Sequence, residues 1–69
     1  MTVEELISNY KSTKNLGEVC ITRNPYTVVY VGDEIDCIDE GTLDSEAQSY
    51  SSGYFTRNNR IEWVLNIEC

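Results

Sequence analysis

Acidic side chains gather in one short segment of this 69-residue chain and are its strongest candidates for chemistry. Seven of the twelve acidic residues lie between Asp33 and Glu46, and no Lys or Arg occurs from Asn24 through Thr56. Such a run forms either a solvated face that keeps a strand edge from aggregating, or a docking surface that attracts a basic partner. The candidate partner-binding residues are Asp33, Glu34, Asp36, Asp39, Glu40, Asp44 and Glu46.

Three cysteines make a second candidate site. Cys20, Cys37 and Cys69, completed by a carboxylate or a water, could bind a zinc ion in tetrahedral geometry. Their wide spacing contains no Cys-x2-Cys pair, and the strand register expected below puts Cys20 and Cys37 on opposite faces of a sheet. We therefore interpret them as reduced thiols that pack like small apolar residues, with no cofactor, and keep zinc as the alternative.

Groups that commonly carry catalysis are missing from the sequence. The chain has no histidine, which removes the usual general base near neutral pH and the commonest metal ligand. It also has no nucleophile elbow, phosphate-binding loop, dinucleotide fingerprint or zinc-protease motif. Exposed carboxylates alone are poor acid–base catalysts at neutral pH, so we expect a protein that is not an enzyme.

Aromatic and basic residues near the C-terminus permit a nucleic-acid interpretation. Tyr50, Tyr54, Phe55, Arg57 and Arg60 combine stacking side chains with cations, as single-strand binders do. Strand alternation instead predicts that the two tyrosines lie in the core, while the arginines flank a turn in solvent. The formal charge of −7 repels phosphate, so we expect no direct nucleic-acid binding.

The N-terminal segment has the pattern of an amphipathic helix over residues 3–14. Thr2 and Glu5 are spaced as a capping box, and Asn15 and Gly17 offer a stop. The apolar residues that recur at helical spacing are Val3, Leu6, Ile7 and Tyr10.

The remaining sequence predicts strands. Residues 40–48 are expected to be a loop or one helical turn. Asn24-Pro25 breaks the first strand, Gly32-Asp33 suits a type II′ turn, and Asn58-Asn59 suits a type I′ turn. The expected strands cover residues 18–22, 26–31, 34–39, 49–57 and 60–68.

Side-chain alternation predicts the register of these strands. Bulky residues then share one sheet face, which the helix covers. A second face carries Val29, Val31, Phe55 and Val64. The fold class is therefore α+β: one N-terminal helix packed on one face of an antiparallel meander sheet of four to five strands. The expected opposite pairs are Val19–Tyr30, Ile21–Val28, Val28–Cys37, Tyr30–Ile35, Tyr50–Ile67 and Tyr54–Trp63.

Length and hydropathy indicate one domain over residues 1–69 with a thin core. The longest apolar run, Val28 to Val31, is far shorter than the roughly 18 residues of a membrane span. The first residues lack the features of a secretory signal. We expect a cytoplasmic protein without membrane contact.

Three features together resemble small acidic proteins of phages and mobile elements, particularly anti-CRISPR proteins. These are the capped Thr2–Ile7 helix start, the short strands and the acid-rich Asp33–Glu46 segment. The resemblance implies a non-catalytic inhibitor in the cytoplasm of a bacterial host. It implies that the chain occupies the basic surface of a nucleic-acid-handling protein, such as a CRISPR effector nuclease.

The alternative hypothesis is a structural or regulatory module that associates with a second copy of itself. A small sheet leaves edges unpaired, and the valine-rich outer face would offer apolar contact area. A homodimer is the expected form of that module.

Overall fold

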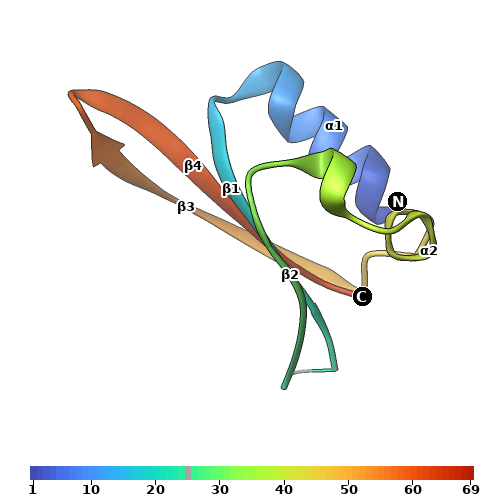
Figure 1. Ribbon diagram of the computed structural model, residues 1–69. Coiled ribbons are helices and arrows are strands. Elements are labelled where there is room, and N and C mark those ends of the chain that lie inside the picture. The colour runs from blue at the N-terminus through green and yellow to red at the C-terminus, as the bar shows by residue number, and fades with distance from the viewer. Residues whose placement is uncertain (25) are drawn as a thin grey trace.

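The fold is a four-stranded sheet with its helices on one side. The computed structural model describes residues 1–24 and 26–69, and Figure 1 shows α1, η1 and α2 lying on the same side of the strands. The strands form one mixed sheet in the order β2-β1-β4-β3, which confirms the α+β class. The elements are α1 Val3–Thr13, β1 Leu16–Arg23, β2 Thr27–Gly32, the 3-10 helix η1 Ile35–Cys37, α2 Glu40–Leu43, β3 Ser49–Arg57 and β4 Arg60–Glu68.

Helix α1 begins with the predicted capping box. The Glu5 N–H donates to Thr2 Oγ1 at 3.2 Å, and the Thr2 N–H donates to Glu5 Oε1 at 3.1 Å. These two bonds satisfy backbone donors that a helix start leaves free. The predicted apolar stripe is confirmed, because its first three residues are buried and Tyr10 is half-buried.

The core lies between α1 and the two central strands. β1 and β4 run parallel, with Val19 opposite Leu65 and Ile21 opposite Ile67, and all four side chains are at most 3% exposed. The buried core comprises Val3, Leu6, Ile7, Val19, Ile21, Ile38, Leu65 and Ile67. Alternation along β1 and β4 therefore places these four aliphatic residues under the helix.

The predicted antiparallel meander is wrong, because residues 34–39 do not form a third strand. Instead the chain leaves β2, forms η1 and α2, and enters the far edge of the sheet as β3. The Tyr30 hydroxyl explains the exit: it donates to the Glu34 carbonyl at 2.7 Å and accepts from the Glu34 N–H at 2.9 Å. A side chain thus satisfies the backbone groups that a strand would need for its ladder.

Gly32 makes that contact sterically possible. A Cβ atom at this position would lie 2.6 Å from the Tyr30 hydroxyl oxygen. Gly32 is the last residue of β2 and its φ is not positive, so the predicted type II′ turn at Gly32-Asp33 is wrong. The predicted cross-strand pairs Tyr30–Ile35 and Val28–Cys37 are therefore also wrong.

The register between β1 and β2 also differs from the prediction. Ile21 lies opposite Tyr30 rather than Val28, and Val19 lies opposite Gly32. The pairing shifts between Ile21 and Thr22, a bulge that adds one residue to the β2 side. As a result Val28 is 61% exposed, whereas Val29, predicted for the outer face, packs against the core.

The β1–β2 connection includes the predicted Asn24-Pro25 break. β1 ends at Arg23, and Asn24 has a φ of 59°, a left-handed conformation that asparagine tolerates. Pro25 lies outside the described residues.

The β3–β4 hairpin confirms the predicted register and turn. Tyr54 pairs with Trp63 and Tyr50 with Ile67. Asn58 and Asn59 have φ values of 52° and 63°, as a type I′ turn requires. The prediction that both tyrosines are core residues is wrong: α1 covers β1 and β4 but leaves Tyr50 56% and Tyr54 66% exposed.

Replacing Tyr30 tests whether its hydroxyl directs the chain out of the sheet. Tyr30→Phe removes both hydrogen bonds to Glu34 and should lower the free energy of unfolding by about 1 kcal/mol. Urea denaturation followed by Trp63 fluorescence measures it. The control Tyr26→Phe, at a residue 94% exposed, should stay within about 0.5 kcal/mol of wild type. Equal effects of the two substitutions would contradict the assignment.

Candidate partner-binding surface

All seven predicted partner-binding acids are exposed on one continuous segment. The segment follows β2 and includes η1 and α2, and Figure 1 shows that it runs from the end of β2 to the N-terminal end of α1, beside which α2 lies. None of these residues belongs to a strand, although residues 34–39 were predicted to form one. Within this segment only Ile38 and Thr42 are buried, and the acidic side chains between them and on either side face solvent.

Apolar anchors and backbone hydrogen bonds hold this segment against the body. Ile38 is 6% exposed within the core, and Ile35 and Leu43 pack against it. The Val3 N–H donates to the Ser45 carbonyl at 2.9 Å, and the Ala47 N–H donates to the Met1 carbonyl at 3.0 Å. The acidic residues are therefore carried on a segment that is fixed to α1 rather than on a detached loop.

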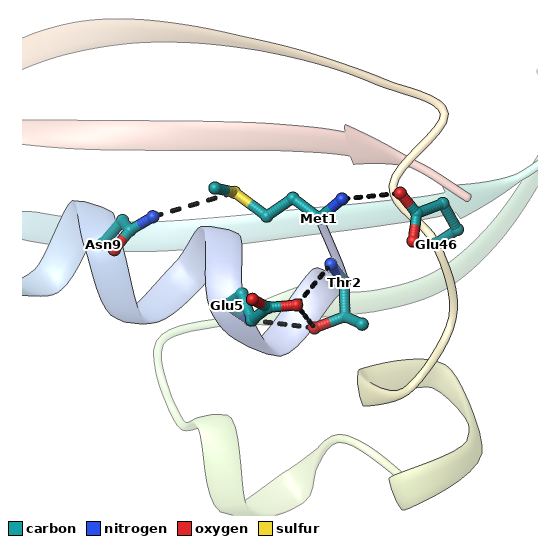
Figure 2. A network of polar contacts seen from close by, with 5 residues as sticks. All are labelled: Met1, Thr2, Glu5, Asn9 and Glu46. Atoms are coloured by element: carbon teal, nitrogen blue, oxygen red, sulfur yellow. Dashed lines mark hydrogen bonds and ion pairs between the residues drawn. The ribbon is translucent and has the colours of Figure 1, made fainter.

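The same contacts bring two further carboxylates to the segment. Figure 2 shows Glu46 facing the Met1 amino group, with an N–O distance of 2.6 Å, while Glu5 turns back onto Thr2. Glu4 and Glu5 in the first turn of α1 are both exposed here. We use the term acidic end for Glu4, Glu5 and the seven acids from Asp33 to Glu46.

Sequence reasoning assigned Glu5 only a capping role and missed that α1 starts beside the acidic segment. The Glu4-Glu5 pair was visible, but the contact between residues 2 and 46 joins positions far apart in the chain. With this contact, nine of the twelve acidic residues lie at the acidic end.

Asp39 has a structural role within the acidic end. Its carboxylate accepts from the Thr42 N–H at 3.0 Å and from the Thr42 hydroxyl at 2.7 Å, capping α2. These hydrogen bonds hold the pKa of Asp39 below its ordinary value, with a smaller contribution from the charge of Arg23. Thr42 is 1% exposed, so the cap also satisfies a buried hydroxyl.

Other acids at this end have no such role. In the part of the chain that the structure describes, the carboxylates of Asp33, Asp36, Glu40 and Asp44 form no hydrogen bond or ion pair. They are available to a partner without loss of an internal contact.

Most of the positive charge lies at the other end of α1 and at the hairpin tip. Lys14 Nζ lies 4.1 Å from the Trp63 ring centroid, and Arg57 Nε lies 3.5 Å from Glu62 Oε2. Figure 1 shows the β3–β4 turn far from α2. Four of the five basic residues, Lys11, Lys14, Arg57 and Arg60, lie toward this end, and Arg23 is the exception.

The three cysteines lie on separate elements. Cys20 is half-buried in β1, Cys37 is exposed in η1, and Cys69 follows β4. Residues 1–24 and 26–69 contain no group of three or more His, Cys, Asp or Glu side chains arranged to hold a metal ion. The Cys37 thiol donates to Glu34 Oε2 at 3.5 Å, which raises the pKa of Cys37 and disfavours the thiolate that zinc requires. The zinc hypothesis gains no support from this arrangement.

A shallow depression lies beside β1, β3 and β4. Its volume is about 210 Å³, and its lining includes Cys20, Ser51 and Asn66. Typical sites for small organic ligands enclose about 300 to 1,000 Å³, so this depression is smaller than such a site.

Among the described helices, none is long and apolar enough to cross a membrane.

The Asp39 cap predicts a contribution to acid sensitivity. Because the folded-state pKa is lowered, the charged carboxylate stabilises the fold above the unfolded-state pKa. That contribution is lost as pH falls through the folded-state value. Asp39→Asn keeps a capping oxygen but removes the charge, so stability should fall less steeply below about pH 4 than in wild type. Thermal unfolding between pH 2 and pH 7 measures this, and Asp36→Asn is the control that should retain the wild-type slope.

Comparison with known proteins identified no relative of this chain. The chain matches no protein-family model, no curated protein and no solved structure.

Proposed function

We propose that this chain is a non-catalytic inhibitor that binds a nucleic-acid-handling protein through its acidic end. In this mechanism the acidic end occupies a basic surface that otherwise holds nucleic acid. A CRISPR effector nuclease in a bacterial cytoplasm is the partner that the sequence resemblance suggests.

The separation of charge is the observation that carries the proposal. Nine carboxylates lie at the acidic end and four of the five basic side chains lie toward the hairpin tip. Screening at physiological salt limits the reach of each charge to about 8 Å, so the two ends act as separate surfaces. A basic groove would be attracted to one end of the molecule and would meet it in one orientation.

The character of the acidic end supports a protein partner over an ion. A bound cation requires oxygen ligands that converge on one point, and no such group is present among the described residues. The four carboxylates without internal contacts are instead distributed from the end of β2 through η1 to the end of α2. Carboxylates distributed in this way can contact several cations on a broad surface, as nucleic-acid phosphates do.

A matched pair of triple variants tests the role of the acidic end. Asp33→Asn/Asp36→Asn/Asp44→Asn removes three charges that make no internal contact. It should lower affinity for the partner about 10- to 100-fold at physiological salt. The control Glu18→Gln/Glu62→Gln/Glu68→Gln removes the same charge from the three acids outside the acidic end and should change affinity less than about threefold.

Binding can be measured with immobilised chain and nuclease-treated lysate of bacteria that carry CRISPR effectors. Captured proteins are identified by mass spectrometry, purified, and titrated against the three forms of the chain. The purified partner should also lose affinity for its guide or target nucleic acid as wild-type chain is added. The mechanism is wrong if the acidic-end variant binds like the control variant, or if nucleic acid and chain bind the partner together.

A further inference from the structure

We propose that β3 is a self-association site, at which a second copy of this chain pairs antiparallel to β3 around a twofold axis. The inference concerns a different surface from the acidic end and does not depend on the proposed function. It gives the sequence-based homodimer hypothesis a specific strand, orientation and set of hydrogen bonds.

Backbone groups of β3 are directed outward at alternate residues. The Trp63 N–H donates to the Asn15 carbonyl at 2.8 Å and the Cys69 N–H donates to the Thr22 carbonyl at 2.9 Å. The backbone groups of odd-numbered residues in β4 therefore point toward β1, and those of even-numbered residues point toward β3. Tyr54, opposite Trp63, therefore belongs to a pair without mutual hydrogen bonds. The N–H and C=O groups that point away from β4 are those of Tyr50, Ser52, Tyr54 and Thr56.

The β3 edge has none of the features that usually prevent pairing. It is nine residues long and contains no proline, and its only charged residue is Arg57 at the end. The opposite edge, β2, is six residues long and is bulged where it pairs with Ile21 and Thr22. Of the two edges, β3 is therefore the better template for another strand.

The charges at the two ends of β3 select an antiparallel second copy. Arg57 lies at one end, whereas Ser49 at the other end pairs with Glu68 and follows shortly after Glu46. Antiparallel pairing places Arg57 of each copy beside the Ser49 end of the other. It also separates the two acidic ends by about the length of the strand, roughly 30 Å, which exceeds the Debye length of about 8 Å.

Exposed aromatic area lies along the same edge. Tyr50 and Tyr54 project on the helix side of β3, where they touch Tyr10 and Trp63 but remain 56% and 66% exposed. A second β3 strand would flank both rings and bury part of this area. Gly53, midway along β3, has no atoms within 4 Å of the position its Cβ would occupy, so the other face near the strand centre is open to the approaching copy.

Hydrogen exchange and sedimentation test the pairing directly. Wild-type chain should sediment as a monomer–dimer mixture between about 10 μM and 1 mM. The amides of Tyr50, Ser52, Tyr54 and Thr56 should exchange more slowly as the dimer fraction rises. A monomer throughout this range overturns the proposal. So does a dimer in which these four amides exchange as fast as in the monomer.

A variant at the centre of the edge separates backbone pairing from side-chain effects. Ser52→Pro removes an outward N–H without breaking the β3–β4 ladder and should weaken dimerisation at least about tenfold. Ser52→Ala removes the hydroxyl that accepts from Tyr10 at 3.3 Å but keeps the N–H, and should dimerise like wild type. If circular dichroism shows that Ser52→Pro is unfolded, Tyr54→Lys replaces it, because like charges near the axis should weaken the dimer similarly. Dimers of wild-type affinity in the folded edge variant would refute the pairing.

Discussion

The parallel pairing of β1 with β4 is the interaction on which the rest of the structure depends. It places Val19 beside Leu65 and Ile21 beside Ile67, and this buried patch is the surface that α1 covers. Without it the two antiparallel pairs would be separate ribbons, each too small to bury an apolar face in water. Because β1 and β4 take the centre, β2 and β3 become edges, and the segment that joins them must cross the helix side of the sheet.

This crossing segment links the architecture to the charge distribution. Its apolar residues Ile35, Ile38 and Leu43 pack toward the core, and its acidic residues remain in solvent as part of the acidic end. The same sheet leaves the hairpin tip and the Arg57 end of β3 at a distance from those carboxylates. The proposed binding of a protein through the acidic end and the proposed pairing through β3 therefore use different residues of one molecule.

Local patterns predicted the elements whose contacts are local. Thr2 and Glu5 identified the start of α1, and Asn58-Asn59 identified the turn and register of the last hairpin. The third strand failed because Tyr30, a residue with high strand propensity, uses its hydroxyl to bind the backbone of Glu34. Gly17 was interpreted as a helix stop, yet it lies in β1 where a Cβ would come within 3.0 Å of Glu62 Cβ. The seven acids of the candidate surface were found as a run, but Glu4 and Glu5 joined them only through a long-range contact.

The central pairing also has a consequence for how the chain reaches this structure. Val19 and Leu65 are 46 positions apart, whereas the β3–β4 turn joins its strands through two residues. Bringing β1 and β4 together closes a longer loop than the β3–β4 turn does, so it costs more chain entropy. The contacts between β1 and β4 stabilise the chain fully only after α1 has packed on both strands. The hairpin and the capped helix can form from nearby residues, so β1–β4 pairing is the step expected to limit folding. Until that step is complete, the β4 edge of the hairpin is unpaired and the apolar face with Leu65 and Ile67 is exposed to solvent.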